Sequence, residues 1–163
     1  MNYYVEFTLI DTPDIALYDL WSKLYTQLHL AFVEHKDANE KVPYGVSFPQ
    51  YQVGQKGDVA FVTLGSKLRI FSETNEQLKA LNLSSWLERL LDYVHVSSIK
   101  PVPTDKPISY LSVARDRAKP FSPARNAAYA ARRGMSEVAA QQHFMQSSRL
   151  KPLPFITLKS LTN

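Results

Sequence analysis

The chain has 163 residues, of which 45% are hydrophobic and 21% charged, a balance typical of a folded soluble protein. It contains no cysteine, which excludes disulfides, thiolate catalysis and cysteine-ligated zinc. The net charge of +4 is uneven: residues 1–100 carry 9 Lys and Arg against 12 Asp and Glu, whereas residues 101–163 carry 10 against 3. This asymmetry predicts a polyanionic partner for the last third, with a merely solubilising basic surface as the alternative.

Several other classes of function are disfavoured. No stretch approaches the roughly 18 apolar residues that a membrane span needs, so we expect no membrane partner. The N-terminal residues MNYYVEF lack the basic-then-apolar pattern of a signal peptide, which favours a cytoplasmic protein. The four histidines show no HExxH or other ligand spacing, and we therefore expect no metal and no other cofactor.

The first elements expected along the chain are a strand and a long helix. Residues 2–10 alternate and are rich in Tyr, Val and Phe, which predicts a strand. The following DTPD is expected to begin a helix, with Pro13 at an early helical position, that runs to about His35. An apolar stripe at helical spacing supports this helix and consists of Leu17, Leu20, Trp21, Leu24, Leu28 and Phe32.

His29 lies at the edge of that stripe. At about 100° per residue, the stripe covers about −40° to 80° around Leu24, whereas His29 falls at about 140°. A side chain in this position can contact both the core and the solvent. Two interpretations stay open from the residues alone: a tolerated core or boundary histidine, or a general base.

The middle of the chain predicts three more strands and a helix. Residues 45–53 and 58–71 are two strand candidates, which we expect to pair antiparallel. A helix is expected over 72–90, with a break near Ser84, and strand character returns over 92–102. The order strand, helix, strand, strand, helix, strand predicts an α+β fold, in which residues 1–100 form a ferredoxin-like (RRM-like) domain.

A proline-rich linker, PVPTDKP, marks the expected start of a smaller domain over residues 101–163. A strand-like segment, ISYLSVAR, follows it. Ser122 is a suitable N-cap, Pro123 a suitable first residue and Gly134 a suitable stop for a helix over SPARNAAYAARRG. A second helix is expected over MSEVAAQQHFMQSSRL and a strand over FITL near the end.

The first of these two helices is basic on one side. Arg125, Arg132 and Arg133 share an arc of about 100° with Tyr129. Guanidinium groups pair bidentately with phosphate and with guanine edges, and tyrosine can stack on a base. The helix therefore predicts nucleic-acid binding, and a solvated surface or an acidic protein partner is the alternative. Further cations precede it closely: Arg115, Arg117 and Lys119.

The sequence resembles the type I-F CRISPR repeat-processing endoribonucleases over essentially all of its length. The resemblance is carried by LWSKLYTQLHLAF, GVSFP at 45–49, SVARDRAK, ARRG and LPFITLKS. The segments GVSFP and LPFITLKS are the more specific ones. The family's pattern continues past the position of Asn163 into a glycine-rich segment and a final sheet region.

The resemblance implies a ferredoxin-like N-terminal domain and a smaller domain that holds an RNA hairpin. It also implies metal-independent cleavage, in which the ribose 2′-OH attacks the adjacent phosphate and leaves a 2′,3′-cyclic phosphate. The family's catalytic histidine falls on His29. The serine that fixes the ribose falls on Ser160, with the hydroxyl of Thr162 as the second candidate.

The RNA contacts implied by the resemblance lie in the basic third. Residues that read base edges near the foot of the hairpin fall on Arg115 and Arg117, and an arginine at 117 favours guanine over adenine. The contacts of the arginine helix fall on Arg125, Arg132 and Arg133, with Tyr129 where the family can carry another arginine. The implied partners are the CRISPR repeat stem-loop and the backbone subunits of a type I-F surveillance complex.

Three functions compete at this point. The first is an endoribonuclease that stays on the crRNA hairpin as a subunit of the complex. The second is a non-catalytic hairpin-binding subunit of the same complex. The third, a ferredoxin-like regulatory or small-molecule domain, leaves the basic last third unexplained.

Overall fold

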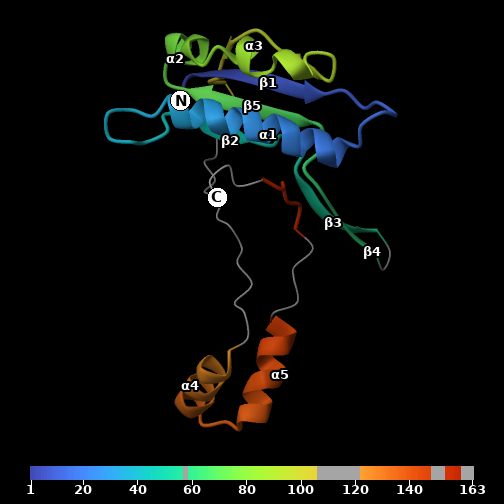
Figure 1. The fold of residues 1–163 in the computed structure, drawn as a ribbon, viewed down its shortest axis with the longest axis vertical. Coiled ribbons are helices and arrows are strands. Elements are labelled where there is room, and N and C mark those ends of the chain that lie inside the picture. The colour runs from blue at the N-terminus through green and yellow to red at the C-terminus, as the bar shows by residue number, and fades with distance from the viewer. Residues whose placement is uncertain (57–58, 106–121, 148–152, 159–163) are drawn as a thin grey trace. The chain divides into compact units, whose positions relative to one another are not determined.

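The structure is a computed structural model that describes residues 1–56, 59–105, 122–147 and 153–158. It combines helices with antiparallel sheets, which confirms the predicted α+β class (Figure 1). The chain divides into two compact units, one made of Met1–Pro107 with Pro154–Asn163 and the other of Ile108–Leu153. Within the described ranges, no helix is long and apolar enough to cross a membrane.

A five-stranded antiparallel sheet forms the centre of the first unit. Strand β1 (Tyr3–Leu9) confirms the strand predicted at 2–10 and pairs with β5 (Lys67–Ser72) along one edge. Its other edge pairs with β6 (Val94–Val96) and then with β7 (Lys100–Pro101). Strand β2 (Gly45–Ser47) pairs with β5, so the strand order is β2-β5-β1-β6.

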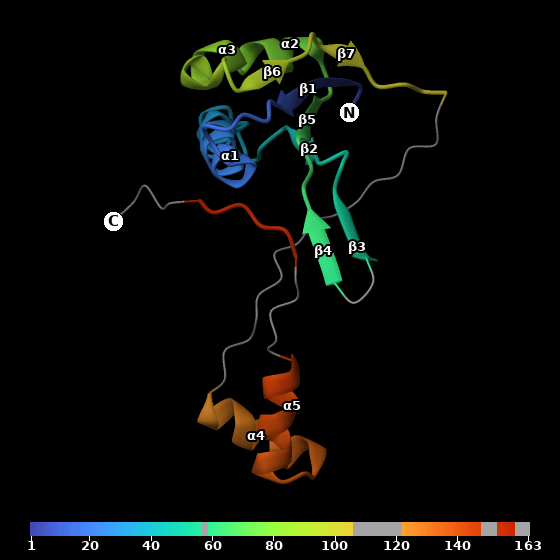
Figure 2. The ribbon, with the colours of Figure 1, turned by 90° about the vertical axis from the view of Figure 1, so that its right-hand side faces the viewer.

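One side of this sheet carries the hydrophobic core. Alternate residues of the strands point to this side, and Phe7 and Ile70 are fully buried there. The helices α1 (Leu17–Glu34), α2 (Asn75–Ala80) and α3 (Leu83–Trp86) pack on this side and complete the core (Figure 2).

Helix α1 confirms the predicted apolar stripe, but it begins later than predicted. Leu24 and Leu28 of the stripe are fully buried. The helix starts at Leu17, with Ala16 as an N-cap that makes no side-chain hydrogen bond. The DTPD segment forms a turn closed by a bridge between Thr12 and Ile15, because the fixed φ of proline suits a turn as well as a helix start.

The two strands predicted over 45–53 and 58–71 are each divided in two. The first becomes β2 and β3 (Gln52–Lys56), and the second becomes β4 (Val59–Thr63) and β5. Strands β3 and β4 form a separate antiparallel ribbon, while β2 and β5 join the central sheet. Gly65, at the second division, has a φ of +72°, which glycine adopts without strain.

The helix predicted over 72–90 is also divided. Thr74 caps α2 in a reciprocal capping box with Gln77. The break predicted near Ser84 comes at Asn82, whose left-handed backbone (φ 45°) separates α2 from α3. A short 3₁₀ turn, η1 (Glu88–Leu90), precedes β6.

In the second unit, the described residues 122–147 form a pair of helices, α4 (Pro123–Arg133) and α5 (Glu137–Ser147). The predicted boundaries of α4 are confirmed: the Ser122 side chain accepts the Arg125 N–H at 3.3 Å, and Gly134 ends the helix with a φ of 63°. The helices approach closely through buried Ala130 and Ala140. The strand predicted over ISYLSVAR lies outside the described residues.

The strand predicted over FITL is wrong, because residues 153–158 have no regular secondary structure. Instead, Phe155 meets Tyr18 of α1 edge to face at 5.6 Å, and the Tyr18 hydroxyl is hydrogen-bonded to Thr157. Ile156 packs against the core. Through these contacts Pro154–Asn163 form part of the first compact unit, and the domain predicted over 101–163 stays a prediction.

Candidate functional site

His29 lies on the fourth turn of α1, with its side chain exposed to solvent. Its neighbours on the helix surface, at positions i−4 and i+3, are Tyr25 and Phe32. Phe32 is buried and Tyr25 is half-buried. The structure therefore confirms that His29 lies at the edge of the apolar stripe, as the helical periodicity predicted.

Aromatic packing holds this part of α1 in place. Phe48, from the GVSFP segment, meets Trp21 edge to face at 5.5 Å and stacks on Tyr25 at 6.4 Å. Tyr44 stacks on Phe32 at 5.5 Å. Burial raises the pKa of Tyr25, so its hydroxyl stays neutral over the physiological range. Phe48 and Tyr44 thus fix the helix on both sides of His29, and helical periodicity alone does not predict these contacts.

The imidazole of His29 itself is open. Within the described part of the chain, no hydrogen bond or ion pair joins it to another residue. The histidine and carboxylate side chains of that part form no group that could hold a metal ion. An exposed imidazole on a rigid helix can exchange a proton with a bound molecule.

The C-terminal segment reaches the same side of α1. Tyr18, which contacts Phe155 and Thr157, precedes His29 by eleven residues, which is about three turns or roughly 16 Å along the helix. After three turns, the two side chains point in nearly the same direction. The predicted residues Ser160 and Thr162 lie outside the described residues, three and five positions after Thr157.

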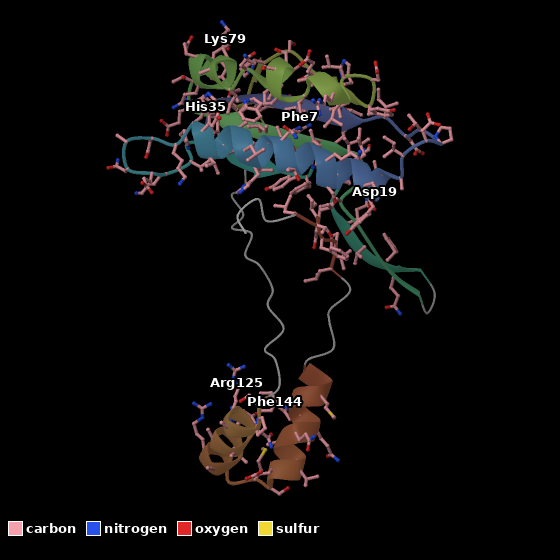
Figure 3. All side chains as sticks on the ribbon, viewed as in Figure 1. Phe7, Asp19, His35, Lys79, Arg125 and Phe144 are labelled. Carbon is pink, nitrogen blue, oxygen red and sulfur yellow. The ribbon has the colours of Figure 1, made fainter. Side chains whose placement is uncertain are left out.

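In the second unit, the side chains of Arg125, Arg132 and Arg133 are exposed on α4, as the helical arc predicted. Arg132 and Arg133 occupy the last turn, where positive charge is favourable next to the helix dipole. Figure 3 shows the side chains of the described residues, among them Arg125 of α4 and Phe144 of α5. The predicted contacts Arg115, Arg117 and Lys119 lie outside the described residues and stay predictions.

Tyr129 packs within the helix pair, although its position on the arc suggested a contact with RNA. Its ring stacks on His143 of α5 at 5.3 Å with an interplanar angle of 7°, and it meets Phe144 edge to face at 5.2 Å. The Arg133 guanidinium lies 5.9 Å from the centre of the same ring. Helical periodicity could not identify this arrangement, because it depends on the position of α5.

Comparison with known proteins identifies the family. A family model described as CRISPR-associated protein (Cas_Csy4) matches residues 4–163. The chain belongs to the Csy4 family. This confirms the predicted family, and the two relatives described next, both named endonucleases, confirm the predicted enzyme class, an endoribonuclease that processes CRISPR RNA.

Two curated relatives are similar over their greater part. One is the CRISPR-associated endonuclease Cas6/Csy4 of Pseudomonas aeruginosa (strain UCBPP-PA14), 30% identical over 161 residues, which cover 98% of this chain and 79% of that protein. The other is the CRISPR-associated endonuclease Cas6/Csy4 of Escherichia coli (strain UTI89 / UPEC), 28% identical over 165 residues, which cover 100% and 80%.

Proposed function

We propose that this Csy4-family protein cleaves CRISPR precursor RNA at the repeat hairpin without a metal ion. The 2′-oxygen of one ribose forms a bond to the adjacent phosphorus, and the bond from phosphorus to the 5′-oxygen breaks. The products are a 2′,3′-cyclic phosphate and a 5′-hydroxyl, which takes up a proton. His29 is the general base that removes the 2′-OH proton, because its imidazole is exposed on α1 and imidazole is the side chain that enzymes use most often as a general base.

The observation that carries this proposal is the common side of α1 shared by His29 and the anchored C-terminal segment. Thr157 is held at Tyr18, roughly 16 Å from His29 along the helix. Three residues span at most about 10 Å, so Ser160 is within reach of a ribose bound beside His29. Ser160 would fix that ribose, and Thr162 is the second candidate. Such positioning supplies the in-line geometry that a metal would otherwise impose.

For the two units, we propose distinct roles. The first is a ferredoxin-like domain, supported by its order of elements and by the strand order β2-β5-β1-β6 with the helices on one side. The second holds the repeat hairpin through the arginines of α4. Because side chains cannot read the deep groove of A-form RNA, these arginines contact phosphates, and the binding weakens steeply with salt. Base reading falls to Arg115 and Arg117, with Lys119 beside them.

We further propose that the protein stays on the crRNA hairpin as a subunit of a type I-F surveillance complex, next to its backbone subunits. The exposed arginines of the second unit support this proposal, because the hairpin phosphates that they would contact are unchanged by cleavage.

The test is cleavage of a labelled type I-F repeat hairpin in the presence of EDTA. His29→Ala is expected to lower the rate by about 10²–10⁴-fold, the usual contribution of a general base, while hairpin affinity stays within about twofold. His35→Ala is the matched control, since His35 caps the same helix with its imidazole bonded to the Ala31 carbonyl oxygen at 2.9 Å. It is expected to cleave like the wild type.

Two outcomes would contradict the proposal. Loss of wild-type cleavage on adding EDTA would show that the reaction needs a metal. If the wild type and His29→Ala both bind the hairpin tightly and neither cleaves it, the chain is a non-catalytic subunit that holds the hairpin.

A further inference from the structure

The side of the sheet away from the helices carries a different set of side chains from the core. Because successive strand residues alternate, the neighbours of buried Phe7 and Ile70 point to this second side, and the helices α1, α2 and α3 leave it uncovered (Figure 2). We call it the open sheet face. Its residues come from β1, β5, β6 and β7: Tyr4, Glu6, Thr8, Lys67, Arg69, Phe71, His95 and Lys100.

Two aromatic rings lie side by side at the centre of the open sheet face. Tyr4 and Phe71 are directly opposite each other on β1 and β5, the two central strands of the order β2-β5-β1-β6. Their ring centroids are 5.7 Å apart, with an interplanar angle of 33°. Both side chains are only half-buried, and neither belongs to the hydrophobic core.

A guanidinium group extends this aromatic pair. The Arg69 guanidinium lies 5.1 Å from the centre of the Tyr4 ring. Glu6 holds it there, because one carboxylate oxygen accepts from Arg69 Nε and the other from Lys67 Nζ, both at 2.7 Å. The Phe71 ring, the Tyr4 ring and the Arg69 guanidinium therefore lie next to one another on this face, and Glu6 holds the guanidinium over the Tyr4 ring.

The charge of the open sheet face favours an anion. Glu6 is its only carboxylate among the residues named above, against the cations Lys67, Arg69 and Lys100. Lys100 is exposed on β7, opposite Tyr4 in the register. The surface therefore keeps an excess of positive charge after the ion pairs with Glu6 are formed.

Aromatic rings on the central strands, with cations around them, are suited to unpaired bases and phosphates. We infer that the open sheet face binds a single-stranded segment of RNA, with bases stacked on Tyr4 and Phe71 and phosphates near Lys100. This site is distinct from the arginines of α4 and does not depend on the proposed cleavage by His29.

The test measures binding of the full chain to a fluorescent eight-nucleotide oligouridylate that cannot form a hairpin. The double variant Tyr4→Leu with Phe71→Leu keeps apolar bulk but removes both rings. It is expected to bind the oligonucleotide at least 20-fold more weakly, because each lost base stack costs about 5- to 100-fold. Its affinity for the repeat hairpin should stay within twofold. Tyr51→Leu removes an exposed ring outside this face and is the matched control, expected to bind like the wild type.

Further measurements keep the result decisive. The His29→Ala variant should bind the oligonucleotide normally, so a failure of cleavage leaves this inference intact.

If the double variant does not fold, photo-crosslinking of the wild type to 4-thiouridine oligonucleotide should label peptides of β1 and β5. Equal weakening by Tyr51→Leu would overturn the inference, as would crosslinks confined to α4. Loss of oligonucleotide binding in Arg132→Ala with Arg133→Ala, but not in the double variant, would overturn it too.

Discussion

The two units of this protein are stabilised in different ways. The first encloses a continuous apolar core between a sheet and three helices, with residues such as Phe7, Leu24 and Leu28 fully buried. The second, within residues 122–145, buries only Asn126, Ala130 and Ala140. An extensive core fixes side chains to within a narrow range of positions, whereas a helix pair joined by alanines has little buried apolar surface to stabilise it.

This difference matches the tasks that we propose for the two units. A general base needs exact placement, and His29 lies on a helix fixed by Phe48 and Tyr44. Phosphate contacts tolerate adjustment, and a ligand that binds only the folded form adds stability to it. The second unit also contains a polar contact between its helices, in which Asn126 Nδ2 donates to the Glu137 carbonyl at 3.0 Å.

The largest effect is expected from Phe7→Ala in the first unit. Phe7 is fully buried on β1, and its truncation should lower the free energy of unfolding by about 3–5 kcal/mol. Urea unfolding checks this value. The control is Val138→Ala, because Val138 of α5 is exposed, and it should lower the free energy of unfolding by less than about 0.5 kcal/mol. An equally large loss from Phe144→Ala would contradict the comparison, because it would give the second unit a core of similar weight.

An intermediate effect is expected from Gly134→Ala in the second unit. Gly134 has a φ of 63°, and an added Cβ would meet no atom within 4 Å, so the cost comes from the backbone alone. We expect the loss of stability of α4 and α5 to be about 1 kcal/mol, measured by amide hydrogen exchange. Gly134→Asn should lose less, because asparagine tolerates the left-handed region. Equal losses from both variants would point to a packing role for the glycine.

The smallest effect is expected from Glu6→Gln on the open sheet face. The hydrogen bond from Lys67, followed by that from Arg69, holds the pKa of Glu6 below its ordinary value against the opposing effect of burial. A lowered pKa stabilises the folded state above the unfolded pKa, and this contribution is lost as the pH falls through the folded pKa. Since Lys67 and Arg69 are about one third exposed, we expect a loss of only about 0.5–1 kcal/mol at pH 7.

Urea unfolding of wild type and Glu6→Gln at pH 7 and at pH 3 checks this prediction. The difference between the two proteins should shrink at pH 3, because the contribution of the ionised Glu6 carboxylate is lost as the pH falls toward and through its folded pKa. A difference that is the same at both pH values would mean that the ion pairs do not contribute.

Much of the fold could be predicted from local patterns. The stripe of α1, the strand β1 and the caps of α4 depend on residues within a few positions of each other, such as Ser122, Arg125 and Gly134. The placement of His29 at the edge of the stripe follows from the same helical period. The family was predicted from short segments, among them GVSFP, whose Phe48 stacks on Tyr25, one helical turn before His29.

Other features depended on contacts that no local pattern contains. The division of the two predicted strands followed from β2 joining the central sheet while β3 and β4 paired with each other. Tyr129 packs against His143 and Phe144 of α5, although the helical periodicity of α4 placed it among the arginines.

By itself, the sequence determined the buried stripe of α1 and both ends of α4, because these depend on short-range interactions. Only the tertiary structure decided that FITL packs on α1 rather than in a sheet, and that Tyr4 and Phe71 share an open face. The physical reason is sequence separation. The hydrogen bond between Tyr18 and Thr157 joins residues 139 positions apart, and the closure entropy of so long a loop must be offset by the tertiary contacts of the whole unit.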